Sequence, residues 1–187
     1  MKDSPGGLTN LAISWNTLRP GIRIPKLPPL TFSGRCVLMG GTGLGSGFLR
    51  PFSASWGSLV GFAYGLALRE IPSASAQWVV AFVVLAFSIP IAGKCARWMN
   101  DPDPKCVVID EIASVPLAIW PAAHLTLSWW QWLLAFVVYR LADLAKPFPA
   151  RRVEALHGGW GIVLDDVVSA LYMGVLWYLC LRFLPRG

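Results

Sequence analysis

Long uncharged runs, separated by short charged segments, dominate the chain from Cys36 onward. The four main runs cover residues 51–68, 71–93, 112–139 and 167–181, with lengths of 18, 23, 28 and 15 residues. A helix needs about 20 largely apolar residues to cross a bilayer. No long stretch of the sequence alternates polar and apolar residues with the period of two that a membrane β-barrel requires. The pattern therefore predicts an all-α membrane protein.

These runs predict about five helices and no sheet. The 71–93 run is long enough to span a bilayer, the 51–68 run is close to that length, and a last helix should cover about 160–183. The 112–139 run is too long for one span and too short for two, and two prolines interrupt it. Because proline breaks helices, we expect a hairpin of two shortened helices there. The chain is thus predicted to form a small polytopic helix bundle.

Residues 1–35 differ from the rest of the chain, because they hold five prolines and five basic residues. Proline interrupts regular helices, and this segment lacks the apolar runs found later, so we expect a flexible basic tail near the cytoplasmic face. Residues 36–187 are expected to form a single membrane-embedded domain.

Composition supports the membrane assignment. The chain is 55% hydrophobic and 14% charged, with a mean hydropathy of +0.55, whereas soluble domains carry about 25% charged residues. The net charge is +6, but the basic residues are dispersed and form no nucleic-acid-binding motif. We therefore expect no nucleic-acid partner, and we expect the basic residues to lie in cytoplasmic loops or against anionic lipid.

Basic residues gather in two segments between the predicted helices, 94–105 and 140–152. Because cytoplasmic loops of membrane proteins are enriched in Lys and Arg, both segments are predicted to face the cytoplasm. The turns near 69–70 and 124–130 then face the opposite side of the membrane. Five crossings make this multi-pass topology self-consistent.

Five carboxylates lie inside or against the apolar runs: Asp110, Glu111, Asp143, Asp165 and Asp166. A charged side chain at bilayer depth costs about 2.5–3.5 kcal/mol, so such residues are functional candidates. Two of the predicted helices begin at these acids and one ends there, and the topology places all five near the cytoplasmic face. Three helix termini are therefore expected to direct carboxylates at one spot.

Carboxylates so close together repel one another unless they pair with a cation. Ligands that are all oxygen suit Mg²⁺ best, with Ca²⁺ and Mn²⁺ next, and Mg²⁺ commonly also binds phosphate oxygens. The pattern therefore favours phosphate chemistry at the lipid–water interface. An alternative from spacing alone is a set of salt bridges, since Arg140 and Asp143 stand three residues apart on one helix and Lys146 could take another acid.

Two further segments are candidates for phosphate contacts. The glycine-rich stretch 40–47, followed by Arg50, could hold an anion on its backbone N–H groups, although composition favours close helix packing by small residues. His157 lies in a predicted loop on the cytoplasmic side. It is either a structural residue or an acid–base group.

Five motifs, in this order and with this spacing, resemble those of the phosphatidylglycerophosphatase A family over residues 36–183. That resemblance implies a bacterial membrane phosphatase that hydrolyses phosphatidylglycerophosphate to phosphatidylglycerol with Mg²⁺. The motifs are GxGSG at 43–47, WGS at 56–58, IDE at 109–111, YRLxDLxKPFP at 139–149 and HGGWGIxxDD at 157–166.

The resemblance also implies roles for individual residues. The family usually reads PGTxGS where this chain has serine, alanine and serine at 53–55, so that Ser55 keeps a hydroxyl. Six residues match catalytic positions, and the five carboxylates among them match metal-binding positions: Asp110, Glu111, Asp143, Asp165, Asp166 and His157. Six residues are expected to bind substrate: Ser46, Arg50, Ser55, Ser58, Arg140 and Lys146.

The leading hypothesis is therefore a Mg²⁺-dependent phosphatase in phospholipid biosynthesis, in the bacterial cytoplasmic (inner) membrane, with its active site facing the cytoplasm. Whether water or a carboxylate attacks phosphorus stays open. The alternative is a small cation channel or transporter lined by intramembrane carboxylates. A channel favours acids at several depths, whereas these acids are expected at one level.

Overall fold

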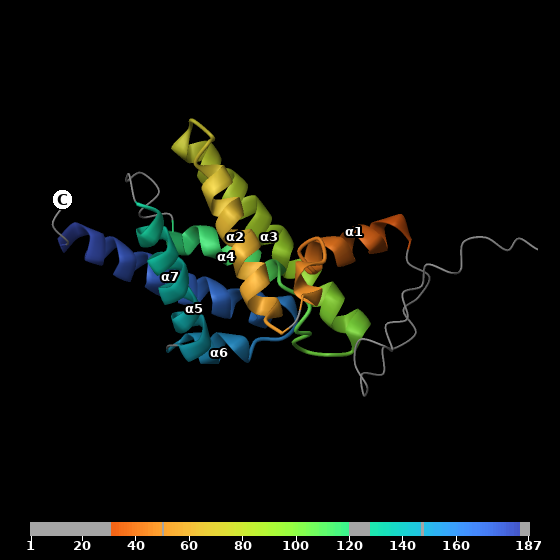
Figure 1. The fold of residues 1–187 in the computed structure, drawn as a ribbon. Helices are drawn as coiled ribbons and strands as arrows, with labels where there is room; N and C mark the ends of the chain where they lie inside the picture. Colours follow the sequence, from red (N-terminus) through yellow and green to blue (C-terminus); the bar gives the residue numbers. More distant parts are fainter. Residues whose placement is uncertain (1–30, 50, 120–127, 147, 184–187) are drawn as a thin grey trace, which may run out of the picture.

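The computed structural model describes residues 31–49, 51–119, 128–146 and 148–183 of the chain. Within these ranges all regular structure is helical (Figure 1), which confirms the predicted all-α class. Seven α-helices and one short 3-10 helix are present in the described residues. They are α1 (Phe32–Gly41), η2 (Ser46–Phe48), α2 (Ser53–Leu68), α3 (Ala74–Met99), α4 (Ile109–Ile119), α5 (Trp129–Ala145), α6 (Ala150–Glu154) and α7 (Gly159–Phe183).

The five helices predicted from the apolar runs correspond to α2, α3, α4, α5 and α7. The 112–139 run does form two short helices, and residues 120–127 between them lie outside the described residues. Helices α1 and α6 are short additions that the apolar pattern did not indicate. Helix α1 begins at Phe32, so the last residues assigned to the tail are helical, while residues 1–30 lie outside the described residues.

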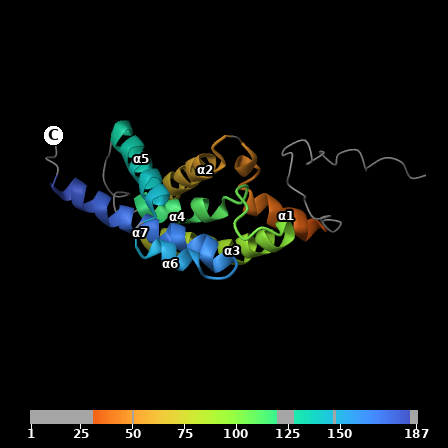
Figure 2. The same cartoon turned by 90° about the horizontal axis from the view of Figure 1, so that it is seen from below.

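Helix α4 lies at the centre of the bundle. Every residue from Asp110 to Ile119 is buried, and α2, α3, α5 and α7 all pack against this helix (Figures 1 and 2). A helix that is apolar on all sides is stable only when other elements surround it. The first turn of α4 is the exception to this apolar character, because it carries the predicted acidic pair into the interior.

Helix α2 approaches α4 closely through a row of glycines. Gly57, Gly61 and Gly65 are spaced four residues apart and are all buried, so they share one face of the helix. A Cβ atom at Gly61 would lie 2.9 Å from the carbonyl oxygen of Glu111 and 2.9 Å from Cα of Ile112. Small residues allow such backbone-to-backbone contact between membrane helices. The glycine row therefore sets the distance between α2 and the acidic turn of α4.

Replacing Gly61 with alanine is expected to destabilise the fold by about 1–3 kcal/mol, because the added methyl group meets backbone atoms that cannot rotate away. Thermal unfolding of the purified protein in detergent measures this loss. Gly40→Ala is the matched control, since a Cβ atom there would meet only Cδ1 of Ile91 at 3.8 Å. Equal melting temperatures for the two variants would contradict the close-approach argument.

Two of the described helices, Ala74–Met99 and Gly159–Arg182, are long and apolar enough to cross a membrane. Large apolar side chains are also exposed along α2, α3, α5 and α7, as expected for a bundle whose outer surface meets lipid. Both observations support a membrane protein. Helices α2 and α5 have 16 and 17 residues, less than the usual spanning length of about 20, so five complete crossings stay a prediction.

Candidate active site

The acidic pair opens the central helix. Asp110 and Glu111 occupy the first turn of α4, where the helix dipole favours negative charge. Both side chains belong to buried residues. A Cβ atom at Gly57 would collide with Oε2 of Glu111, so this glycine of α2 leaves the room that the carboxylate occupies. The local sequence thus places two acids inside the bundle, beside the glycine face of α2.

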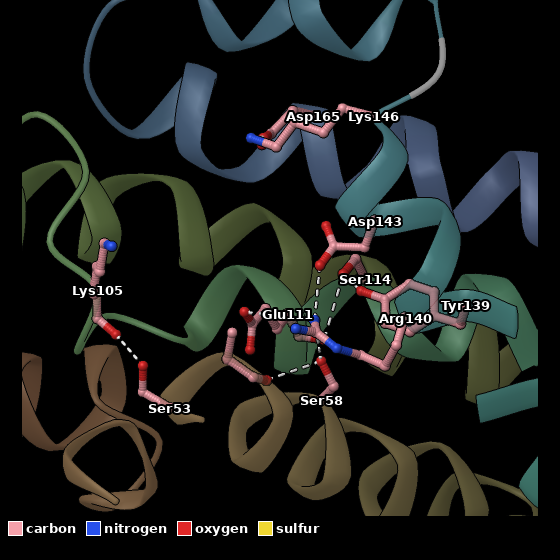
Figure 3. Close-up of polar contacts among 11 residues, drawn as sticks. Ser53, Ser58, Lys105, Glu111, Ser114, Tyr139, Arg140, Asp143, Lys146 and Asp165 are labelled. Carbon is pink, nitrogen blue, oxygen red and sulfur yellow. Dashed lines mark hydrogen bonds and ion pairs between the residues drawn. The ribbon is translucent and has the colours of Figure 1, made fainter. Parts of the chain in front are cut away.

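Arg140 connects three helices around this pair (Figure 3). Its Nη1 donates hydrogen bonds to Oγ of Ser58 at 2.9 Å and to Oδ2 of Asp143 at 2.7 Å, and lies 3.8 Å from Oε1 of Glu111. Ser58 is on α2, Glu111 on α4, and Asp143 on α5 with the arginine itself. One guanidinium group therefore holds a serine hydroxyl and two carboxylates in a fixed arrangement.

A second buried contact is made by Tyr139, the residue before this arginine. The hydroxyl of Tyr139 is 3.0 Å from Oγ of Ser114, and that Oγ donates to the backbone carbonyl of Glu111 at 3.3 Å. With Oγ of Ser114 acting as that donor, the tyrosine hydroxyl is left to donate to Ser114. Both residues are fully buried. The contact fixes α5 on α4 one position away from Arg140.

Lys146 forms the corresponding link to α7. It caps the C-terminal end of α5 in a left-handed conformation, with φ of 42°. Its Nζ lies 2.7 Å from Oδ2 of Asp165 and 2.8 Å from Oε1 of Glu154. Partial burial lowers the pKa of Lys146, but the hydrogen bonds to Asp165 and Glu154 outweigh it and raise the pKa above its usual range. This lysine is therefore a permanent positive charge beside α7.

The five predicted carboxylates converge. Asp166 lies within electrostatic range of Asp110, Asp143, Asp165 and Glu111. These residues come from the start of α4, the end of α5 and the second turn of α7. Charges that influence one another across three helices lie in the same part of the bundle, and their convergence on a single catalytic spot stays a prediction.

The sequence left two interpretations of these acids open, a metal site and a set of salt bridges, and the ion pairs in the structure bear on the second. Asp143 and Asp165 are bound by Arg140 and Lys146, as the salt-bridge interpretation expects. Asp110 and Asp166 have no ion pair among the described residues. Salt bridges therefore do not account for the whole cluster.

Four buried carboxylate oxygens in the described part of the chain lack a hydrogen-bond partner: Oδ1 of Asp110, Oε2 of Glu111, Oδ1 of Asp165 and Oδ2 of Asp166. A buried charge without a partner is costly, so these are the atoms available to a hard cation. Among the described residues, no group of three or more acidic, histidine or cysteine side chains is arranged so that it could hold a metal ion. A cation here would need further oxygen ligands from water or substrate.

The remaining predicted residues have other placements. His157 is exposed in the turn before α7, Ser55 is half-buried on α2, and Ser46 begins η2 with a buried hydroxyl that has no partner. Hydrogen bonds and ion pairs within the described ranges do not connect these three side chains to the carboxylates. Arg50 lies outside the described residues. The structure thus brings Ser58, Arg140 and Lys146 to the acids, out of six predicted substrate contacts.

The glycine-rich stretch uses its backbone amides internally. The N–H groups of Gly43, Gly45 and Gly47 donate to carbonyls of residues 40 and 42 at 3.0–3.1 Å. A Cβ atom at Gly47 would collide with the carbonyl of Cys106. These observations support the packing interpretation, which composition favoured, over an anion cradle.

Sequence reasoning missed three residues that the structure places at the site: Ser114, Tyr139 and Glu154. Ser114 stands three residues after Glu111, and helical periodicity could have placed it on the same face. Tyr139 precedes Arg140 within a quoted motif, but it was not proposed as a site residue. Glu154 pairs with Lys146 across the turn into α6, and no spacing rule indicates that contact.

Comparison with known proteins identifies the family of this chain. The family model described as phosphatidylglycerophosphatase A matches residues 39–181, which is most of the chain and contains every carboxylate of the cluster. The chain belongs to the phosphatidylglycerophosphatase A family. The resemblance noted in the sequence is confirmed, and the chain is an enzyme of the phosphoric monoester hydrolase class.

Individual relatives agree with the phosphatidylglycerophosphatase A assignment. A phosphatidylglycerophosphatase A from Haemophilus influenzae is 35% identical over 132 residues, which is 70% of this chain and 79% of the relative. A phosphatidylglycerophosphatase A from Escherichia coli is 28% identical over 147 residues, which is 78% of this chain and 83% of the relative. A candidate phosphatidylinositol-3-phosphatase from Bacteroides thetaiotaomicron is 32% identical over 141 residues, which is 73% of this chain and 87% of the relative. No solved structure matches the chain significantly.

Proposed function

We propose that this chain hydrolyses phosphatidylglycerophosphate to phosphatidylglycerol and inorganic phosphate, with Mg²⁺, in phospholipid biosynthesis. The names of two relatives support this substrate. The apolar outer surface and the two membrane-length helices support a lipid substrate that reaches the site from the bilayer. The channel alternative is set aside, because the family to which the chain belongs is a phosphatase family.

One observation carries the proposal: buried carboxylates of α4 and α7 have unpartnered oxygens, and two fixed cations, Arg140 and Lys146, lie beside them. Buried acidic side chains alone, or buried basic side chains alone, could not bind a metal ion together with a phosphate monoester. Carboxylates repel phosphate, whereas a mixed set can hold a metal ion and phosphate together. Arg140 and Lys146 supply hydrogen-bond donors for phosphate oxygens.

The oxygen-only donor set fits Mg²⁺, which commonly takes one or two carboxylates and completes its shell with water and phosphate oxygens. We propose that one or two of the four acids with unpartnered oxygens, Asp110, Glu111, Asp165 and Asp166, hold the ion, with Asp143 positioned by Arg140. When bound, Mg²⁺ polarises phosphoryl oxygens and lowers the pKa of coordinated water. The ion also offsets the mutual repulsion of the acids.

Hydrolysis breaks the bond between phosphorus and the oxygen of the lipid glycerol, and a hydroxyl group from water ends on phosphorus. The leaving glycerol oxygen gains one proton, and the attacking water loses one. A carboxylate of the cluster is suited to accept that proton. Arg140 is suited to stabilise negative charge on the phosphoryl oxygens, because Ser58 and Asp143 already hold its guanidinium in place.

We also propose a multi-pass topology with the active site at the cytoplasmic face of the bacterial inner membrane. The end of α5, the start of α7 and helix α6 lie together at the lower edge of the view in Figure 1. The segment 140–152, which runs from the last turns of α5 into α6, contains four of the basic residues, and such a basic segment favours the cytoplasmic side.

The test is phosphate release from phosphatidylglycerophosphate by the purified full chain in detergent, with Mg²⁺ and then with EDTA. We expect release with Mg²⁺, loss of at least about a hundredfold in EDTA, and recovery when Mg²⁺ is restored. Phosphatidylinositol-3-phosphate is assayed in parallel, because one relative is named for it. Faster phosphate release from that lipid would contradict the proposed substrate. Undiminished release in EDTA would contradict the proposed requirement for Mg²⁺.

A further inference from the structure

A surface next to the site combines exposed cations with exposed apolar rings. It is formed by α6, the turns on either side of it and the first turn of α7, and we call it the α6 patch. Phe148, Leu156 and Trp160 are 66%, 49% and 56% exposed, and both arginines of α6 are exposed as well. The α6 patch comprises Phe148, Arg151, Arg152, Leu156 and Trp160.

The α6 patch is anchored to the bundle. Ala150 is completely buried, and α6 packs against α7. The guanidinium of Arg152 lies 4.7 Å from the ring centre of Phe148, so cation and ring share one surface. Neither Arg151 nor Arg152 has an acidic partner in the described ranges, and the adjacent acid, Glu154, is bound by Lys146. The two positive charges are therefore directed outward on a fixed scaffold.

This combination matches the headgroup layer of a membrane more closely than water or hydrocarbon. Aromatic side chains are enriched at the membrane–water interface. Arginine places its charge among phosphates while its stem and neighbouring rings remain in apolar surroundings. Anionic lipid attracts basic residues that lie close to the membrane surface. The α6 patch also begins two residues after Lys146, which caps α5, and α6 lies below α5 and α7 in the view of Figure 1.

We propose that the α6 patch binds the headgroups of anionic phospholipids at the membrane surface, as a site separate from the one that holds the phosphate monoester. Arg151 and Arg152 pair with lipid phosphates, while Phe148, Leu156 and Trp160 enter the interface. This contact needs no hydrolysis, so it goes beyond the proposed function. It presses the end of the bundle that carries the acids against the surface from which a lipid phosphate approaches.

The test uses Trp160 as the reporter. The full chain is reconstituted in phosphatidylcholine vesicles that contain either brominated phosphatidylserine or brominated phosphatidylcholine, and tryptophan quenching is compared with that of Trp160→Phe. The difference isolates Trp160. We expect stronger quenching by the brominated anionic lipid, with about fivefold loss of that preference for each arginine replaced by glutamine. Added salt should weaken the preference.

Arg182→Gln is the matched control, because it removes an exposed arginine from the opposite end of α7. It should keep the preference that Arg151→Gln/Arg152→Gln loses. Equal quenching by the two lipids, or a preference unaffected in the double variant, would overturn the proposal. So would displacement of phosphatidylserine by inorganic phosphate beyond the effect of chloride at equal ionic strength, which would indicate a phosphate site. These outcomes are independent of phosphate release and leave the proposed function unaffected.

Discussion

Replacing Asp166 with asparagine is expected to abolish Mg²⁺-dependent phosphate release while leaving the helical fold intact. Asp166 is buried, lies among four other acids, and has an oxygen without a partner. Asparagine keeps the shape of the side chain and removes its charge, which relieves repulsion among the acids and removes a ligand of the proposed Mg²⁺ ion. Loss of outer-shell partners of metal sites already costs 10–100-fold. We therefore expect a loss of at least about a hundredfold in turnover, with an unchanged or higher melting temperature.

Phosphate release and thermal unfolding are measured on the same detergent preparation of the Asp166→Asn variant. Glu70→Gln is the control, because Glu70 is an exposed acid in the turn between α2 and α3. It should alter neither quantity. If Asp166→Asn lowers the melting temperature and spares turnover, the acid is structural, and the proposed metal site is wrong.

Replacing Arg140 with alanine is expected to damage both stability and activity. The guanidinium holds Ser58 and two carboxylates, and its side chain is 12% exposed. Removing one partner of a buried ion pair leaves the other charges uncompensated and costs about 3–5 kcal/mol. We expect a clear fall in melting temperature, and loss of phosphate release even at temperatures where the variant is folded.

A graded series separates the contacts of Arg140. Ser58→Ala removes one hydrogen bond and leaves both acids paired, so its effect should be far smaller than that of Arg140→Ala. Arg140→Lys keeps the charge but not the planar fork, and should recover stability more than activity. Arg182→Ala controls for the loss of an exposed arginine. If Arg140→Ala melts like the wild-type protein, the three-helix connection described here is wrong.

Much of the fold was predictable because apolar runs report directly on helices that face lipid or one another. The runs indicated α2, α3, α5 and α7, and the length of the 112–139 run indicated two helices in place of one, although Pro116 lies inside α4 and does not end it. The short helices α1 and α6 were not predicted, because α1 has only the short apolar run 36–39 and α6 has none. Helix α6 has only five residues, and its sequence is mostly charged.

The site was predictable at the level of residue type and depth, but not of pairing. Apolar surroundings marked the five acids, and topology placed them together. The bond from Arg140 to Ser58 joins residues 82 positions apart in the sequence, and the packing of α2 and α5 against α4 and against each other brings them together. Spacing suggested the Arg140–Asp143 pair because both stand on one helix. It could not show that Lys146 would divide its hydrogen bonds between Asp165 and Glu154.

The position of α4 has a consequence for biosynthesis. This helix is enclosed on all sides, and α7, the last described helix, supplies both part of that enclosure and two of the acids. During translation the acidic turn of α4 leaves the ribosome before α7 has been made. In that interval α7 cannot yet cover this turn. The acidic cluster is therefore completed late in synthesis. A polypeptide that ends before α7 would lack two of the five acids and would leave the polar turn of α4 uncovered.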